Sequence, residues 1–440
     1  MSTLLTREVA TDIINALREG MVPSEGIEHI AVGLDDQIAA IESELAHVAT
    51  RRGDYKAIRG EWGAGKTFLS KLALARAAAK GFATSHVTLS GQETRLFKLE
   101  EVYRAIVRGL VLPGVRRGAL QQILERWIAQ RARAVIETDG VHEDDPRHED
   151  AVARAIHRAL DDIAADAPSF AIALGAYYKA KRDEDYALSR GLIGVLSGDP
   201  SIGAAIKRQA GLKGDLEGPM ALAYLRALLE ILHAAGMSGL VVVLDEADRL
   251  THFRGPERMK AWETLHQLVE ALRGNRFPGL YLVVTGTRAL FEGRKGIREY
   301  GALDQRLSVT FHDDEPDDLR QRQIRLRGFD RARLVAVARR VREVFPASQP
   351  ARVALKATDA LIDAIVEKVS SGFGGQIAVM PRVFLREWVK ILDLIDQSEK
   401  YEPEAKYRFD LKDQKDLSSD EQVAAGIAAA VEGDVPPQVF

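Results

Sequence analysis

Short apolar runs recur along the chain, and glycine or polar residues follow them. An apolar run of this length is typical of a strand that is buried on both faces, as in a parallel sheet. Apolar positions at helical spacing separate the runs, so the pattern predicts an α/β fold with a parallel five-stranded sheet flanked by helices. The five predicted strands cover residues 55–58, 85–90, 240–244, 280–284 and 307–311.

The longest gap between predicted strands has helical periodicity. From about residue 110 to residue 235, apolar residues recur every three or four positions in successive segments. The pattern therefore predicts a long helical insertion at 110–235. This insertion lies within an α/β domain at 30–318, which follows a helical lead-in at 1–29.

A second helical region follows the last predicted strand. Amphipathic patterns at residues 330–345, 358–371 and 380–395 predict three helices without intervening strands. Such a group forms a separate small domain, which we assign to residues 319–398. The remaining residues, 399–440, lose the pattern and are predicted to be a polar C-terminal tail.

The segment at residues 60–70 lies between the first predicted strand and an alanine-rich helical run. It contains Gly60-x-x-x-x-Gly65-Lys66-Thr67, which is the P-loop pattern in the strand-to-helix context that phosphate binding requires. Glycines let backbone N–H groups approach phosphate oxygens, and the following helix adds the positive end of its dipole. Lys66 would bridge the β- and γ-phosphates, and the Thr67 hydroxyl would bind Mg²⁺. The other residues of the predicted phosphate cradle are Gly63, Ala64 and Phe68. The alternative is a glycine-rich turn that contains a chance lysine.

Carboxylates end the third predicted strand, where residues 240–244 run directly into Asp245 and Glu246. In P-loop enzymes with this arrangement, the aspartate holds Mg²⁺ and the adjacent glutamate polarises the attacking water. We therefore predict Asp245 as a metal-binding residue and Glu246 as the catalytic base. The alternative is a core strand that ends in a solvated acidic turn.

Polar residues also flank the last two predicted strands. Thr285 and Thr287 end the strand at 280–284, and we favour Thr285 over Thr287 as the residue that contacts the γ-phosphate. Arg306 precedes the strand at 307–311, at the predicted rim of the domain. A guanidinium there suits stabilisation of the phosphoryl group that a neighbouring subunit transfers. The alternative for Arg306 is a surface arginine beside a strand.

Proline begins the last predicted helix. Pro381 suits the first turn of a helix, which puts Arg382 in that turn, where an arginine of a lid can reach back to bound phosphates. Residues 372–376, with the sequence GFGGQ, predict a flexible joint before this helix. The alternative for Arg382 is again a surface residue.

Composition narrows the class of protein. The chain has 440 residues, of which 46% are hydrophobic and 28% charged, and this suits two or three domains with ample core. It has no cysteine, which excludes disulfides, cysteine nucleophiles and thiolate metal sites. The net charge of −3 neither requires nor excludes nucleic acid. No apolar run is long enough to cross a bilayer and no signal-like sequence opens the chain, so we expect a cytoplasmic protein without membrane partners.

Taken in order, these motifs resemble those of AAA+ ATPases, in the branch near initiator and STAND-like proteins. The resemblance covers residues 30–394, from the segment before the P-loop to the helix that begins Pro-Arg. More closely, the segments "INALREGMVPSEGIEHIAVGLDDQ", "GEWGAGKTFLSKLALARAAAKGF", "LVVVLDEADRL" and "PGLYLVVTGT" are similar to the ATP-binding proteins of BREX phage-defence systems, of the BrxD type. Trp62 stands where this resemblance implies a smaller or tyrosine-like residue.

The resemblance implies an AAA+ core with a C-terminal helical lid that binds ATP and Mg²⁺ and hydrolyses ATP. It puts Gly33 and Asp35 in the segment that flanks adenine, and Arg382 in the lid. It also implies a DNA-associated defence protein that works with other components of the system, such as a helicase. The role predicted for Arg306 requires copies of the chain to associate head to tail, as a ring or a helix.

Three classes of function remain open from the sequence. The first is an ATP-hydrolysing motor or switch that acts on DNA, and the second is a nucleotide-gated signalling scaffold. The third is a loader of the transposition or initiator type, which binds DNA and recruits a helicase. The presence of Lys66, Asp245 and Glu246 favours the first over an inactive scaffold. Salt-dependent DNA binding would separate the first and third from the second.

Overall fold

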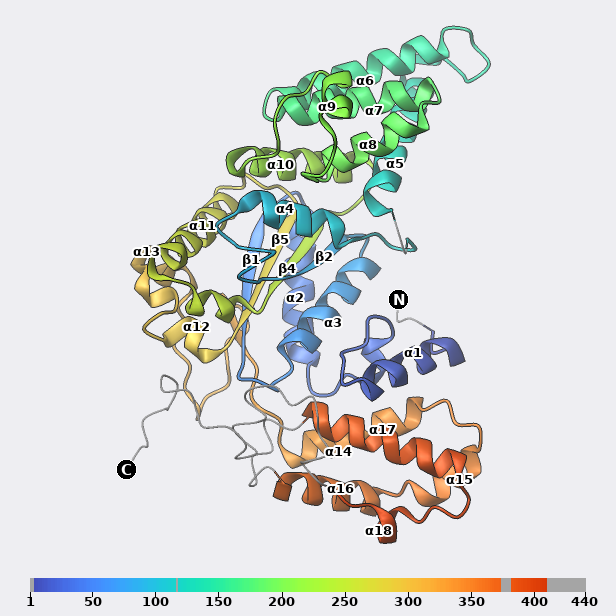
Figure 1. Cartoon of the computed structure of the whole chain (residues 1–440), viewed down its shortest axis with the longest axis vertical. Coiled ribbons are helices and arrows are strands. Elements are labelled where there is room, and N and C mark those ends of the chain that lie inside the picture. Colours follow the sequence, from blue (N-terminus) through green and yellow to red (C-terminus); the bar gives the residue numbers. More distant parts are fainter. Residues whose placement is uncertain (1–3, 116–117, 373–380, 410–440) are drawn as a thin grey trace.

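The computed structural model describes residues 4–115, 118–372 and 381–409. Along its longest axis, the molecule has a group of helices at one end, a sheet covered by helices in the middle, and a second group of helices at the other end (Figure 1). The predicted joint at 372–376 begins at Gly372, which is the last residue of helix α16, Asp359–Gly372. The rest of the joint lies outside the described residues. So does the predicted tail from residue 410 onward.

The sheet has six strands in the order β3-β2-β4-β5-β1-β6. Neighbouring strands pair in parallel except at one edge, where the two-residue β3 is antiparallel to β2. Four of the five predicted strands are confirmed, as β1, β2, β4 and β5. The strands are β1 Asp54–Arg59, β2 Ala83–Thr88, β3 Leu110–Val111, β4 Leu240–Asp245, β5 Leu280–Gly286 and β6 Gln323–Arg325.

The fifth predicted strand, at 307–311, is wrong. Leu307 is the last residue of helix α13, Gly301–Leu307, and residues 308–311 are not in a strand. The apolar ring of Phe311 instead lies against two guanidinium groups, those of Arg59 at 5.3 Å and Arg325 at 4.8 Å from its centroid. The fifth parallel strand is β6, which pairs with β1.

Helices cover both faces of the sheet because its strands carry apolar residues on both sides. Val241 and Val243 of β4 pack with the helices of one face, while Val242 and Leu244 pack with those of the other. This alternation follows from the two-residue period of a strand. The first face is covered by α2 Asp35–Val48 and α3 Lys66–Ala79, and the second by α4 Leu99–Arg108, α10 Gly218–Ala234 and α11 Gly255–Arg273.

A group of helices follows β3 and stands beyond the second face of the sheet, at the top of Figure 1. Contacts between aromatic rings join this group of helices to the core. The ring of Tyr224 in α10 makes edge contacts with Tyr103 of α4 at 5.7 Å and Phe170 of α7 at 5.1 Å. The helices are α5 Ala119–Asp139, α6 His148–Ala164, α7 Pro168–Arg182, α8 Tyr186–Leu196 and α9 Ala204–Gln209.

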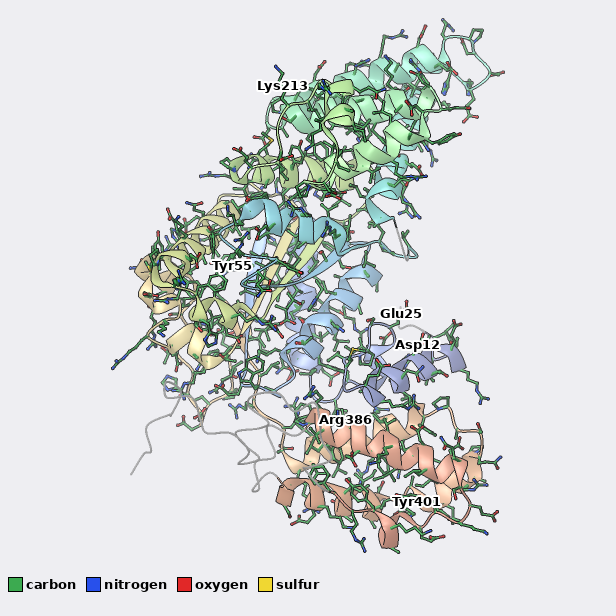
Figure 2. The ribbon with its side chains drawn as sticks, in the orientation of Figure 1. Asp12, Glu25, Tyr55, Lys213, Arg386 and Tyr401 are labelled. Atoms are coloured by element: carbon green, nitrogen blue, oxygen red, sulfur yellow. The ribbon has the colours of Figure 1, made fainter. Side chains whose placement is uncertain are left out.

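The other end of the molecule joins the start of the chain to its last helices. Helix α1, Arg7–Arg18, packs on α17, and its Ile14 and Leu17 share a buried cluster with Trp388. Arg18 also pairs with Asp393 of α17 at 2.8 Å. Figure 2 shows Asp12 of α1 and Arg386 of α17 in this end of the molecule. Its remaining helices are α14 Arg331–Val344, α15 Pro350–Lys356, α16 Asp359–Gly372, α17 Pro381–Gln397 and α18 Pro403–Lys406.

Candidate functional site

The loop between β1 and α3 follows a path that needs glycine. Gly63 and Gly65 have φ values of 79° and 94°, in the left-handed region that L-residues with a side chain rarely adopt. At Gly60, an added Cβ would lie 3.0 Å from the Cβ of Ala64 and 3.1 Å from that of Leu326. The loop then turns into α3, which begins at Lys66 and directs its first free N–H groups toward the loop.

Lys66 is buried inside this loop. Its Nζ donates hydrogen bonds to the carbonyl oxygens of Gly60 at 2.8 Å and Glu61 at 3.2 Å, and lies 5.2 Å from the centroid of the Trp62 ring. Burial lowers the pKa of Lys66, although the carboxylates of Asp248 and Glu61 oppose the shift. The ammonium is therefore a desolvated cation. Within the described ranges only carbonyl groups accept its hydrogen bonds, and an anion can displace them.

Asp245 ends β4 beside the start of α3. The Thr67 hydroxyl donates to its Oδ2 at 3.0 Å, the Thr285 hydroxyl donates to its Oδ1, and Nε2 of His86 lies 3.1 Å from Oδ2. Burial pushes the pKa of Asp245 upward, but its contacts with His86 and the Thr285 hydroxyl outweigh burial, so this pKa lies below its ordinary value. The side chain is thus a fixed carboxylate in contact with three neighbouring elements.

Glu246 has an unusual backbone conformation. Its φ is 60°, in the left-handed region, and its N–H donates to the Thr285 hydroxyl oxygen at 3.1 Å. Its carboxylate pairs with Arg249, with 2.5 Å between Oε2 and the guanidinium. Burial raises the pKa of Glu246, and the positive charge of Arg249 acts in the opposite direction. A glutamate with a raised pKa is suited to accept a proton.

These side chains open onto one cavity of about 270 Å³. Its polar end is formed by the loop and by the carboxylates that follow β4, and its other walls are mainly apolar, with two arginines among them. Those walls come from the start of the chain and from the helical end of the molecule, so the cavity lies between them. The polar end contains Trp62, Gly63, Ala64, Gly65, Lys66, Thr67, Asp245, Glu246 and Asp248, and the other walls include Leu17, Val22, Ile30, Val32, Leu34, Phe68, Phe329, Val337, Arg382 and Leu385.

The family described as BREX system ATP-binding protein BrxC/D matches residues 5–411, which is most of the chain. The chain belongs to this family. It is therefore an ATP-binding protein of a phage-defence system. Among curated proteins, no match to the chain was found. Within the described residues, no helix has the length and apolar character needed to cross a bilayer.

Some predicted site residues of this BREX ATP-binding protein lie outside the cavity walls. Gly33 and Asp35 are exposed, and the cavity is lined instead by their neighbours Val32 and Leu34. Gly60 contributes its carbonyl oxygen to Lys66 rather than a surface to the cavity. Arg382, in contrast, lines the cavity at the start of α17.

The two predicted threonines and Arg306 are set back from the cavity. Thr285 is buried behind Asp245, and Thr287 is buried as the residue before α12, Arg288–Glu292. Arg306 lies in α13, where its guanidinium pairs with Glu270 of α11 at 2.5 Å. Its carbonyl oxygen accepts a hydrogen bond from Tyr55, at the start of β1. Since the P-loop follows the other end of β1, Arg306 lies beside the end of β1 that is opposite its own P-loop.

Sequence reasoning missed several residues of this site. Asp248 is buried in the cavity wall, where burial raises its pKa and the charge of Lys66 opposes the shift. His86 contacts Asp245 from β2, and Arg333 lies 4.8 Å from the centroid of the Phe329 ring at the apolar wall. Asp248 could have been suspected from its place three residues after Asp245. The other contacts join distant parts of the chain and have no local signal.

Proposed function

We propose that this BREX ATP-binding protein hydrolyses ATP at the cavity between the P-loop and β4, in a core of the AAA+ type. The observation that carries the proposal is the meeting of Thr67 and Asp245 at 3.0 Å, with Lys66 and Glu246 lining the same cavity. A lysine, a hydroxyl and two carboxylates at the carboxyl edge of a parallel sheet are the groups that P-loop enzymes use. The sheet order, with β1 between β5 and β6, is consistent with this proposal.

In the proposed mechanism, the loop and Lys66 hold the phosphates of ATP. Lys66 exchanges the carbonyl oxygens of Gly60 and Glu61 for oxygens of the β- and γ-phosphates. The first N–H groups of α3 donate to the same phosphates, and the helix dipole favours their negative charge. The apolar walls of the cavity suit the adenine ring, because they remove it from water.

The residues at the polar end also fit Mg²⁺. The hydroxyl of Thr67 and the carboxylate of Asp245 are hard oxygen donors of the kind that Mg²⁺ prefers. We propose that Thr67 binds the ion directly and that Asp245 does so through water. When bound, the ion neutralises charge that develops on the β- and γ-phosphates. His86 and Thr285 keep the Asp245 carboxylate in place for this role.

Glu246 is the proposed catalytic base. Its carboxylate polarises the water that attacks the γ-phosphate, which requires the deprotonated form. Its ion pair with Arg249 competes with that water for the same carboxylate. The carboxylate therefore has to leave Arg249, at least in part, before the water can be polarised.

We extend the proposal to the assembly of the protein. The Arg306 side chain is 34% exposed and its residue lies at the end of β1 opposite its own P-loop, which supports an action on the ATP of a neighbouring subunit. Such an arrangement is head to tail and closes into a ring or forms a helix. Association with DNA and with other defence proteins, such as a helicase, is part of the same proposal. It predicts DNA binding that weakens steeply with salt.

The experiment that tests ATP hydrolysis compares two substitutions. Lys66→Ala should abolish ATP binding, because it removes a charge-assisted contact to the phosphates. Glu246→Gln should retain ATP binding but lower turnover by about 10² to 10⁴, the range expected for loss of a general base. ATP affinity is measured with a fluorescent ATP analogue and turnover by phosphate release. Lys80→Ala, at the far end of α3, is the matched lysine control and should behave as the unmodified protein. Normal turnover in Glu246→Gln would refute its assignment as the base.

A further inference from the structure

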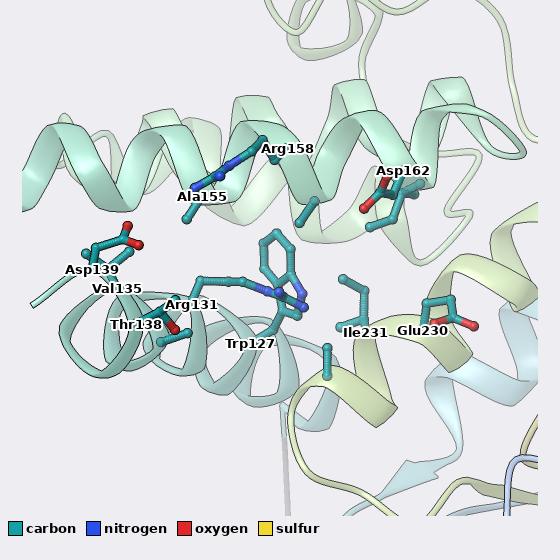
Figure 3. A pocket seen from close by; sticks show the side chains of 14 residues that line it. Trp127, Arg131, Val135, Thr138, Asp139, Ala155, Arg158, Asp162, Glu230 and Ile231 are labelled. Atoms are coloured by element: carbon teal, nitrogen blue, oxygen red, sulfur yellow. The ribbon is translucent and has the colours of Figure 1, made fainter.

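A groove of about 490 Å³ lies in the helical insertion, away from the ATP cavity. It is bounded by α5, α6 and the end of α10 (Figure 3). Its volume is within the range of small-molecule sites, about 300 to 1,000 Å³. The charged and aromatic side chains that bear on ligand binding are Trp127, Arg131, Asp139, Arg158 and Asp162.

Arg131 is the first of these groups that points to a ligand. Its Nε atom is buried and has no hydrogen-bond partner among the described residues. A buried donor without an acceptor is costly, so its partner is expected to come from outside the chain. The guanidinium lies 5.8 Å from the centroid of the buried Trp127 ring, which supports its flat face. Arg131 is thus held against Trp127 in the wall of the groove, with no acceptor for its Nε among the described residues.

The charges along the groove alternate in sign. Arg131 of α5 and Arg158 of α6 occupy its middle, with Asp139 toward one end and Asp162 toward the other (Figure 3). At about 1.5 Å of helical rise per residue, Asp139 lies roughly 12 Å along α5 from Arg131, and Asp162 roughly 6 Å along α6 from Arg158. A complementary ligand therefore has an anion at its centre and hydrogen-bond donors on both sides.

The balance of positive and negative side chains in the groove also limits the net charge of a ligand that can bind there. The two arginines are matched by the two aspartates, and the further carboxylate at this groove, that of Glu230, already pairs with Arg51 at 2.5 Å. The groove is therefore close to neutral, and a ligand with several adjacent phosphates, such as ATP, would meet uncompensated repulsion. A single phosphodiester carries one negative charge, which suits a groove whose own charges balance.

We propose that this groove binds one phosphodiester step of a nucleic acid or dinucleotide, with bases that carry exocyclic amines on either side. The phosphate accepts hydrogen bonds from Arg131, Arg158 adds a second positive charge along the groove, and the bases stack against the Arg131 guanidinium and the apolar wall. Asp139 and Asp162 accept hydrogen bonds from amino groups of adenine, cytosine or guanine. Thymine and uracil have no exocyclic amine. The site deepens the proposed association with DNA by naming where a strand is held, and it does not depend on ATP hydrolysis.

The test measures direct binding to the full chain by fluorescence anisotropy, without nucleotide. The probes are labelled single strands of oligo-dC and oligo-dT, each about 12 nucleotides long, which is within the length that one such groove engages. Unlabelled CpC and TpT dinucleotides are used as competitors. Oligo-dC should bind about tenfold more tightly than oligo-dT, because only cytosine has an exocyclic amine that can donate to the two carboxylates.

Substitutions separate the roles of the two kinds of charge. Arg131→Gln should weaken the binding of both strands by about tenfold or more, since it removes a phosphate contact. Asp162→Asn should retain binding of oligo-dT and reduce the preference for oligo-dC. Arg133→Gln is the matched control, because Arg133 is exposed on the same helix and pairs with Glu137 at 2.9 Å. It should bind both strands as the unmodified protein does.

The outcomes distinguish this site from the ATPase. Each variant is first checked for an unchanged thermal transition and unchanged ATP affinity, so that a folding defect is recognised. Competition by CpC but not TpT shows that the dinucleotide step alone is recognised, and binding only of the longer strands shows that the source is a nucleic acid. Equal binding of oligo-dC and oligo-dT, or an Arg131→Gln variant that binds as tightly as Arg133→Gln, would overturn the proposal even if ATP hydrolysis is intact.

Discussion

Glu246 combines a left-handed backbone conformation with an ion pair to Arg249. Its backbone is in the left-handed region, which costs a residue with a side chain of order 1–3 kcal/mol. The hydrogen bond from its N–H to Thr285 offsets part of this cost and ties the residue to the neighbouring strand. The backbone conformation therefore sets the position of the Glu246 Cα–Cβ bond, and the ion pair with Arg249 sets the orientation of the carboxylate.

Replacement of Arg249 should change the pH dependence of turnover. Burial raises the pKa of Glu246, and Arg249 holds it lower than burial alone would. In Arg249→Ala the pKa of Glu246 therefore rises further. Because the base has to be deprotonated, the acidic limb of the turnover profile should move to higher pH. The measurement is kcat against pH at saturating ATP, with Arg254→Ala as a control that leaves the profile in place. A limb that stays in place or moves to lower pH would contradict the assignment.

At the scale of the element, prediction from sequence succeeded where a pattern is local. The strands β1, β2, β4 and β5 were all predicted. The sequence also predicted that Lys66, Thr67, Asp245 and Glu246 belong to one site, and these four residues line the same cavity. Each of these motifs is contiguous, and parallel strands bring their carboxyl ends to one edge of a sheet.

The edge strand β6 shows why the rest could not be predicted. It is three residues long, and its sequence, Gln-Ile-Arg, is mostly polar. Its place beside β1 depends on distant contacts, such as the hydrogen bond from the Gln323 side chain to the carbonyl oxygen of Leu307. The more apolar run at 307–311 looks like a strand, yet it ends a helix and packs Phe311 against arginines. Local hydrophobicity could not separate these two segments.

Lys56 is a buried charge that connects elements, and its replacement should destabilise the sheet. Its ammonium pairs with Glu44 of α2 and donates to the carbonyl oxygens of Leu319 at 2.9 Å and Gln321 at 2.7 Å, just before β6. Lys56→Met leaves Glu44 without its cation, so the free energy of unfolding should fall by about 3 kcal/mol. Urea denaturation measures this loss.

A double substitution separates the charge from the packing. In Lys56→Met with Glu44→Gln, the uncompensated carboxylate is removed, and part of the lost stability should return. Glu44→Gln alone gives the cost of the second substitution. If the free energy of unfolding of the double variant lies below that of Lys56→Met by this full cost, the two charges do not act as a pair.

At the scale of the whole molecule, the cavity beside the loop between β1 and α3 joins distant parts of the chain. One wall includes Leu17 of α1, another comes from α14 and α17, and the polar end belongs to the sheet. Lys71 of α3 adds a direct link, because its Nζ donates to the carbonyl oxygen of Val22 at 2.7 Å. ATP bound between these parts would stabilise their mutual arrangement.

The proposed head-to-tail assembly gives a test that a single subunit cannot mimic. Arg306→Ala should retain ATP affinity but lower turnover by roughly a thousandfold, as expected for an arginine that acts on a neighbour. Glu246→Gln alone should also be nearly inactive. Mixing the two variants at equal concentration creates interfaces where an intact Glu246 meets an intact Arg306 of another subunit, so phosphate release should partly return.

Two controls make the mixing experiment decisive. Exchange of subunits is followed by energy transfer between labelled copies, and Arg273→Ala serves as an arginine control, because Arg273 pairs with the same Glu270 at 3.3 Å. A mixture that exchanges subunits but stays inactive would argue that Arg306 acts only within its own chain.

The position of Trp62 has an optical consequence. The chain has four tryptophans, of which Trp127, Trp262 and Trp388 are fully buried, whereas Trp62 is 39% exposed on the P-loop. A collisional quencher dissolved in water, such as acrylamide, reaches an indole only where the ring meets solvent. Most of the quenchable emission of the unmodified protein therefore comes from the loop between β1 and α3, and binding of a ligand in the cavity can be followed by tryptophan fluorescence without any attached dye.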